Sequence, residues 1–196
     1  MIDYKSELNE EQYRVVTEGD GPCLVLAGAG SGKTRAITYR VAYLLEQGVS
    51  PERILLLTFT NKAADEMLRR VGQLAGGTPH GLWGGTFHKI GLRILRQYAE
   101  LLGYRRDFSI LDAEDSKDLV KICMKEEGLM GTKSFPGAGA VHGIISFSIN
   151  ADISIDEVLD GKYPQYEKFA ETFKLIADRY REKKRTAQVM DFDDLL

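Results

Sequence analysis

The sequence has 196 residues, of which 43% are hydrophobic and 28% are charged, so we expect one sizeable globular domain, with or without an insertion. It has no apolar run of about 18 residues and no basic-then-apolar N-terminus, which predicts a cytoplasmic protein without a membrane helix, a signal peptide or a membrane partner. The formal net charge of −3 excludes a chain that is basic overall, although it allows a local basic face for nucleic acid.

The first half of the chain alternates predicted helices and strands. A short helix is expected at 9–17 with Asn9 as its N-cap, and a continuous apolar strand follows at 22–27. A glycine-rich turn then leads into a helix at 33–46, which has apolar residues at helical spacing and which Gly48 ends.

A second strand is predicted at 54–60, without alternation, as is typical of a strand covered on both faces. Asn61 can cap the helix that follows it. A short strand near 82–87 leads into a helix at about 88–102. Because strands that alternate with helices form βαβ units, the expected fold class is α/β with a parallel sheet.

The pattern changes after the apolar segment 108–111. The following stretches have helical patterns without strands between them, and the last residues, V-M-D-F-D-D-L-L, look like a return to the first domain. We therefore expect a first domain at 1–111, an inserted helical subdomain at 112–186 and a return segment at 187–196.

The cysteines and histidines show no metal-binding pattern. Cys23 and Cys123 lie far apart and match no metal or redox spacing, so two buried thiols in a reducing compartment are expected. His80, His88 and His142 have no ligand spacing either. A metal held by cysteine or histidine is therefore not expected.

Residues 27–34 read A-G-A-G-S-G-K-T and follow the first apolar strand. Glycines let successive backbone N–H groups surround an anion, and the helix that starts here adds the positive end of its dipole. Lys33 can reach the β- and γ-phosphates of a nucleotide, and the Thr34 hydroxyl can bind Mg²⁺. The alternative is a structural glycine turn before an ordinary helix. The residues expected to contact the nucleotide are Ala27, Gly28, Ala29, Gly30, Ser31, Gly32, Lys33, Thr34 and Arg35.

Four stretches, in this order, resemble the motifs of superfamily 1A DNA helicases of the UvrD, PcrA and Rep type. They are L-N-E-E-Q at 8–12, A-G-A-G-S-G-K-T at 27–34, T-F-T-N-K-A-A at 58–64 and G-T-F-H at 85–88. D-F-D-D-L-L at 191–196 resembles the segment where the first motor domain of that family resumes. The resemblance implies a P-loop NTPase with a RecA-like parallel sheet flanked by helices and an inserted all-α subdomain.

The resemblance also implies that Gln12 reads the adenine base, since a carboxamide offers both a donor and an acceptor. The spacing of Asn9 and Gln12 equally fits a capping box, in which the glutamine side chain closes the start of a helix. Both roles can coexist only if the side chain is shared.

Phe59 would, by the same resemblance, stack on a base of single-stranded DNA. The alternative is a core phenylalanine in line with Leu55 and Leu57. The residues implied to contact the DNA backbone are Asn61, Lys62, Thr86 and His88. Threonine and asparagine at strand ends are also ordinary helix caps, so that interpretation stays open for two of them.

Two charged stretches near the C-terminus have competing interpretations. D-F-D-D does not match the metal-binding motif of the family, an apolar strand ending in Asp-Glu-x-Gln, and acids in the first turn of a final helix explain it better. The basic run at 181–185 either contacts duplex DNA or forms a solvated helix end.

The resulting hypothesis is the N-terminal part of an ATP-dependent 3′-to-5′ DNA helicase that uses ATP and Mg²⁺ to unwind duplex DNA in replication or repair. Its expected partners are single-stranded and duplex DNA and the remaining helicase domains of the parent chain. In the nomenclature of the family, these are the rest of the first motor domain, 1A, and the domains 2A and 2B. The acids and arginines that complete hydrolysis are expected beyond residue 196, so these residues alone should lack ATPase and unwinding activity. The alternatives are the motor of a RecB- or AddA-like helicase–nuclease, a P-loop small-molecule kinase, and a DNA-binding module with a vestigial nucleotide site.

Overall fold

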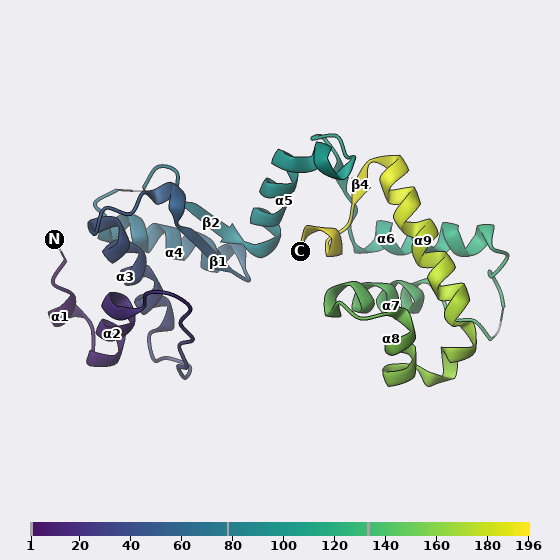
Figure 1. The fold of residues 1–196 in the computed structure, drawn as a ribbon, viewed down its shortest axis with the longest axis horizontal. Coiled ribbons are helices and arrows are strands. Elements are labelled where there is room, and N and C mark those ends of the chain that lie inside the picture. The colour runs from purple at the N-terminus through teal and green to yellow at the C-terminus, as the bar shows by residue number, and fades with distance from the viewer. Residues whose placement is uncertain (1, 78, 133) are drawn as a thin grey trace. The chain divides into compact units, whose positions relative to one another are not determined.

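The computed structural model describes residues 2–77, 79–132 and 134–196 (Figure 1). The chain divides into two compact units, Met1–Ile90 and Gly91–Leu196. The first is a mixed unit of helices and strands, and the second is mostly helical.

The first unit begins with three helices, and the glycine-rich segment lies between the second and the third: α1 (Tyr4–Glu7), α2 (Glu10–Glu18) and α3 (Lys33–Glu46). Asn9 is the N-cap of α2, as predicted, and it forms a capping box with Gln12. Helix α3 has the limits that its apolar spacing predicts.

The sheet of the first unit consists of two short parallel strands. They are β1 (Leu55–Thr58), which follows the 3₁₀ turn η1 (Pro51–Arg53), and β2 (Trp83–Thr86). Helix α4 (Asn61–Leu74) lies between them in sequence, and its residues Met67 and Val71 pack into one core with Leu56 of β1. The predicted parallel pairing of strands is confirmed for these two short strands. The N-cap of α4 is Thr60 and not Asn61, because the Thr60 hydroxyl accepts the Ala63 N–H.

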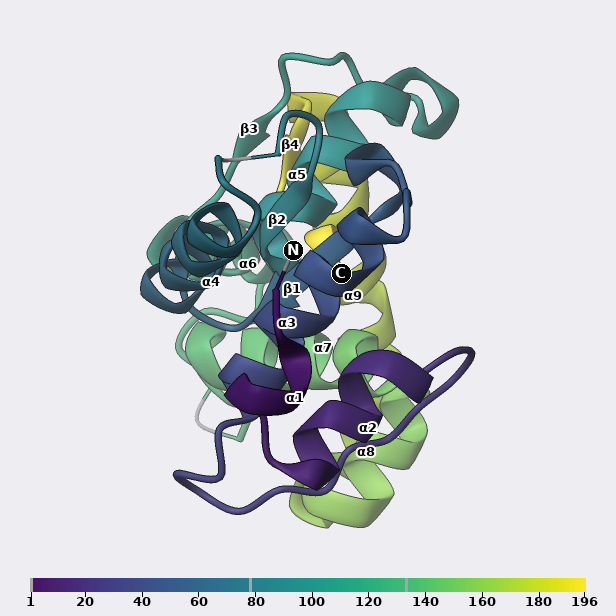
Figure 2. The ribbon, with the colours of Figure 1, turned by 90° about the vertical axis from the view of Figure 1, so that its left-hand side faces the viewer.

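The predicted strand at 22–27 is wrong for this structure. The segment forms no strand, and Leu24 and Leu26 are 85% and 87% exposed. Figure 2 shows it as an open loop between α2 and α3. A strand needs a neighbour for its backbone hydrogen bonds, and within the described residues neither β1 nor β2 pairs with this segment. Leu55 is also 52% exposed, so the expectation that both faces of β1 are covered is wrong as well.

The second unit begins within helix α5 (Phe87–Tyr98), which continues as the 3₁₀ turn η2 (Ala99–Leu102) and not as the single helix predicted for 88–102. Strand β3 (Ser109–Ile110) then pairs in parallel with β4 (Val189–Met190). The chain segments before and after the long helical region therefore meet in one ladder.

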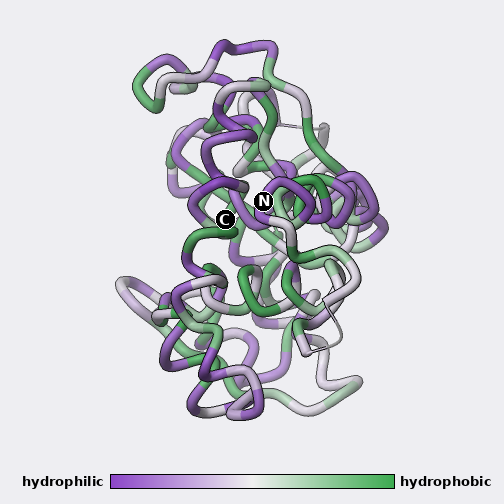
Figure 3. Tube along the Cα trace, turned by 90° about the vertical axis from the view of Figure 1, so that its right-hand side faces the viewer, coloured by the Kyte–Doolittle hydropathy of each residue, from purple (hydrophilic) through white to green (hydrophobic). Residues whose placement is uncertain are grey.

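Helices fill the region between these two strands, as predicted. They are α6 (Ala113–Glu126), α7 (Ala138–Ala151), α8 (Ile155–Lys162), the 3₁₀ turn η3 (Pro164–Phe169) and α9 (Ala170–Ala187). Figure 3 shows hydrophobic and hydrophilic stretches alternating along the chain, as is typical of elements that pack around a core. That core contains Val120, Val141, Ile144, Phe173 and Ile176, all at most 1% exposed. The predicted domain limits at 111 and 186 stay a prediction.

A buried ion-pair cluster closes the second unit. Lys184, within the basic run, is 2% exposed, and its ammonium lies 2.7 Å from the Asp191 carboxylate and 2.6 Å from that of Asp194. The Tyr180 hydroxyl donates to Asp191 across 2.6 Å. Lys184 therefore fits neither interpretation of the basic run: it is not part of a solvated helix end, and it is not exposed for contact with DNA. Asp193 and Asp194 lie in a 3₁₀ turn, η4 (Asp193–Leu195), where the final helix was predicted.

The two cysteines differ in their surroundings. Cys123 is buried, as predicted, whereas Cys23 is exposed, in a loop that pairs with no strand in the part of the chain that the structure describes. Burial raises the pKa of the Cys123 thiol. Among the described residues, no helix has both the length and the apolar character needed to cross a membrane.

Candidate functional site

The glycine-rich loop at 27–32 is shaped by its backbone. Gly30 and Gly32 have φ values of 79° and 87°, which side chains disfavour, and a side chain at Gly28 or Gly30 would meet nothing within 4 Å. Gly32 is the N-cap of α3, and no side chain of the described residues bonds to that cap. The first N–H groups of α3 are therefore available to an anion, with the positive end of the helix dipole behind them.

Lys33 folds its side chain back over this loop. Its ammonium donates to the carbonyl oxygen of Ala27 across 2.9 Å and to that of Gly28 across 2.7 Å. The Ser31 hydroxyl donates to the same Gly28 carbonyl across 2.8 Å. A phosphate at the start of α3 can thus accept hydrogen bonds from the Lys33 ammonium in place of these carbonyl oxygens. Hydrogen bonds between charged groups are stronger than those between neutral groups.

Gln12 joins the loop to helix α2. Its Nε2 donates to the carbonyl of Ser31 across 2.9 Å, and its Oε1 accepts the Asn9 N–H across 3.4 Å. A β-carbon at Gly32 would lie 2.5 Å from that Nε2, so Gly32 is needed for its backbone angle and for this contact. The side chain is shared between the capping box and the loop.

A cavity of about 220 Å³ lies where α2, the loop and the start of α3 meet. Gln12, Ser31 and Lys33 are among its lining residues. Arg35 is not, because its guanidinium donates to the Glu7 carbonyl across 2.9 Å and stacks over the ring of Tyr39 in the same helix. Thr34 is exposed in the first turn of α3, beside the loop.

The implied DNA contacts lie around the ends of β1 and β2. Phe59 is 88% exposed, so it is not a core residue. Asn61 and Lys62 are exposed at the start of α4. Thr86 is 8% exposed and its hydroxyl accepts the Lys89 N–H across 3.2 Å, so it serves as a helix cap. His88 is half-buried in the first turn of α5.

The sequence did not single out Phe87, which the structure places beside Phe59. The ring centroids are 5.5 Å apart, and Phe87 is 41% exposed. The signal that could have found it is its position in G-T-F-H, at the end of the strand predicted near 82–87.

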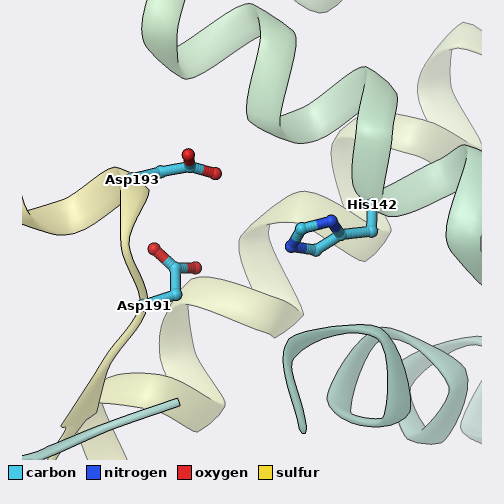
Figure 4. A group of neighbouring side chains, drawn as sticks. All are labelled: His142, Asp191 and Asp193. Atoms are coloured by element: carbon cyan, nitrogen blue, oxygen red, sulfur yellow. The ribbon is translucent and has the colours of Figure 1, made fainter. Parts of the chain in front are cut away.

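His142 of α7 points toward Asp191 and Asp193 in Figure 4, and one ligand-type atom of each lies within 4.8 Å of the others. The Lys184 ammonium already neutralises Asp191, and Asp193 accepts a bond of 2.8 Å from the Asn150 side chain. A bound cation would meet the repulsion of that ammonium. The group is better described as part of the polar cluster that ties α7 and α9 to the C-terminal turn.

Known proteins similar to this chain agree on one class. The model of a family described as the UvrD/REP helicase N-terminal domain matches residues 8–196, and the chain belongs to this family. The ATP-dependent DNA helicase PcrA of Staphylococcus aureus (strain Mu50 / ATCC 700699) is 38% identical over 192 residues, which cover 97% of this chain and 26% of that protein. PcrA of Staphylococcus epidermidis (strain ATCC 12228 / FDA PCI 1200) is 38% identical over 190 residues, or 96% of this chain and 25% of that protein. The chain thus spans about a quarter of the length of these relatives.

Proposed function

We propose that this chain is the nucleotide- and DNA-binding N-terminal part of an ATP-dependent DNA helicase that unwinds duplex DNA, in the 3′-to-5′ direction, in replication or repair. The observation that carries the proposal is the glycine loop at the start of α3, with the Lys33 ammonium held inside it. Family membership supports it, as do relatives named ATP-dependent DNA helicase PcrA.

In this proposal the fold is that of a RecA-like P-loop NTPase. Residues 1–111 begin the first motor domain, 112–186 form the inserted helical subdomain, and 187–196 return to the motor domain. The ladder between β3 and β4 supports this order, because it joins the segments on either side of the helical region. The rest of the parallel sheet would come from the remaining helicase domains, which are the expected protein partners.

The phosphates of ATP would lie against the loop at 27–32. Lys33 would contact the β- and γ-phosphates, and the exposed Thr34 hydroxyl would hold Mg²⁺ together with acids from outside this chain. Bound Mg²⁺ neutralises charge on the phosphates. Arg35 would have to leave Glu7 to reach the nucleotide, so it is the weakest of the proposed contacts.

Gln12 can read adenine without giving up its present bonds. A carboxamide has two N–H donors and two oxygen lone pairs, and Ser31 and Asn9 use one of each. The remaining donor and lone pair match the acceptor and donor on the N6/N7 edge of adenine.

Single-stranded DNA would cross the carboxyl ends of β1 and β2. Phe59 offers an exposed face to a base, while Asn61, Lys62 and His88 would contact the backbone. Thr86, whose hydroxyl caps α5, would offer its remaining lone pair or its hydroxyl hydrogen to DNA.

The proposal is tested on the purified 196-residue chain with single-stranded oligonucleotide, Mg²⁺ and ATP. We expect micromolar-range or weaker binding of ATP and of the oligonucleotide, without phosphate release, since the remaining hydrolytic groups would lie outside this chain. A chain that binds neither molecule would contradict the proposal. DNA-stimulated phosphate release that Lys33→Ala abolishes would contradict the expected inactivity of the chain alone.

A further inference from the structure

Phe59 and Phe87 leave the sheet at the same edge. The register pairs Thr58 with Thr86, so the next residue of each strand is a phenylalanine. Their ring planes are inclined by 43° with centroids 5.5 Å apart. Their exposed fractions are 88% and 41%, and neither ring belongs to a buried core cluster of the described residues. This pair is the two-ring platform.

The surroundings of the two-ring platform suit an anionic chain. Helix α4, of 14 residues, and helix α5, of 12 residues, both begin within two residues of a ring. Their N-termini direct backbone N–H groups and positive dipole ends to this edge. Lys62 and Lys89 are exposed in the first turns of these helices. Aromatic faces beside cations and helix N-termini match bases and phosphates of a single-stranded nucleic acid.

We propose that Phe87 is a second base-contacting residue and that the two-ring platform receives neighbouring bases of one single strand. This inference rests on the proposed DNA binding and adds a residue to it. Bases stacked on one another are parallel, whereas the two ring planes are inclined by 43°. Two bases that lie flat on the two rings are therefore unstacked from each other at this step. Phe87, the more shielded ring, also orients Phe59 through their contact.

The experiment compares two oligonucleotides of about 12 nucleotides, one of thymidines and one without bases, by fluorescence anisotropy with the 196-residue chain. The variants are Phe59→Ala, Phe87→Ala, Phe87→Leu and the double alanine variant. Leu101→Ala, at a leucine that is 82% exposed on η2, is the matched control for loss of an exposed apolar side chain.

We expect each single alanine variant to lose roughly 5- to 150-fold in affinity for the thymidine strand and nothing for the strand without bases. Because the rings support each other, the double variant should lose less than the product of the single losses. Phe87→Leu, which keeps an apolar side chain, should fall between the unchanged chain and Phe87→Ala. Leu101→Ala should bind as the unchanged chain does.

Three outcomes would overturn the inference. If Phe59→Ala weakens thymidine binding but Phe87→Ala and Phe87→Leu do not, DNA binding stands and the role of Phe87 fails. If the Phe87 variants weaken both strands equally, Phe87 is only structural. If the unchanged chain binds neither strand, the proposed DNA binding fails and this inference fails with it. Should Phe87→Ala not fold, as judged by circular dichroism, Phe87→Leu decides between these results.

Discussion

The carboxamide of Gln12 donates from Nε2 to the backbone carbonyl of Ser31 across 2.9 Å. The same side chain accepts the Asn9 N–H through Oε1. The start of helix α2 is thus tied to the phosphate loop by a residue that the sequence assigned either to a cap or to adenine. A change at Gln12 should therefore affect loop and helix together, whereas a change at Asn9 should affect the helix alone.

Gln12→Ala should lower both stability and nucleotide affinity. It removes two hydrogen bonds, so we expect a loss of about 1–2 kcal/mol in the free energy of unfolding and a weaker ATP complex. Asn9→Ala is the matched control, because it removes the N-cap, worth about 1 kcal/mol, and leaves the bond from Gln12 to Ser31 in place. Urea unfolding and ATP titration measure the two effects. Equal ATP affinity in both variants would show that the Ser31 bond has no part in binding.

Lys184→Met should destabilise the second unit strongly. The lysine and Asp191 side chains are 3% and 4% exposed, and removing the ammonium leaves a buried carboxylate without its charged partner. We expect a loss of roughly 3–5 kcal/mol near neutral pH. Lys183→Met is the control, since that lysine pairs with Glu126 near the surface and should cost under about 1 kcal/mol. Similar losses in both variants would contradict the buried pair.

The loss in Lys184→Met should shrink in acid. Burial opposes ionisation of Asp191, but hydrogen bonds from Lys184 and Tyr180 hold its pKa below the usual value, whereas burial raises the pKa of Asp194. In the unchanged chain the contribution of Asp191 is therefore present above its unfolded pKa and is lost as the pH falls through the lower folded pKa. Without Lys184, burial raises the pKa of Asp191 in the folded chain, so protonation of Asp191 in acid removes the cost of a buried, unpaired carboxylate. The unfolding free energies of the unchanged chain and Lys184→Met should therefore differ less at about pH 5 than near pH 7.

Gly91→Ala and Gly143→Ala should change stability in opposite directions, although both glycines lie in helices. A β-carbon at Gly91 would overlap the Leu195 carbonyl oxygen, so the C-terminal turn must shift, and we expect a loss of about 1–3 kcal/mol. A β-carbon at Gly143 would meet nothing within 4 Å, so alanine should stabilise α7 by about 0.5–1 kcal/mol. Thermal unfolding distinguishes the two, and a neutral Gly91→Ala would rule out the close approach.

The cysteines should react at very different rates with a thiol reagent. Cys23 is exposed, whereas Cys123 is buried and its burial raises the pKa of the thiol, which leaves less of the reactive thiolate. Mass spectrometry should find Cys23 labelled first and Cys123 only after urea is added. Equal labelling in the folded chain would contradict the placement of Cys123.

Local patterns predicted the helices well and the first strand poorly. Helix α3 and the capping box of α2 depend on neighbouring residues, so the spacing of apolar and capping residues was sufficient to find them. The segment at 22–27 has a strand composition, but strands form only with partners, and within the described residues it has none. The same lack of a partner explains why Cys23 is exposed.

Contacts between distant residues could not be read from the pattern. The sequence identified Gln12, Lys33 and Phe59 by their motifs, yet the bond from Gln12 to Ser31 and the contact of Phe59 with Phe87 join segments 19 or more residues apart. Lys184 looked like one of several surface cations, and only tertiary packing brings it to Asp191. The residue types of the site could therefore be predicted from the sequence, whereas the residues that they contact could be found only in the folded structure.

The most direct test of the proposed function is isothermal titration of Mg·ATP into the 196-residue chain and its Lys33→Ala variant. Lys121→Ala, at an exposed lysine of α6, controls for loss of one surface charge. We predict that Lys33→Ala loses about tenfold or more in affinity, because a charged donor to the phosphates is removed, while Lys121→Ala binds as the unchanged chain does. Equal affinity of the unchanged chain and Lys33→Ala, or no binding by the unchanged chain, would contradict a nucleotide site in the glycine loop.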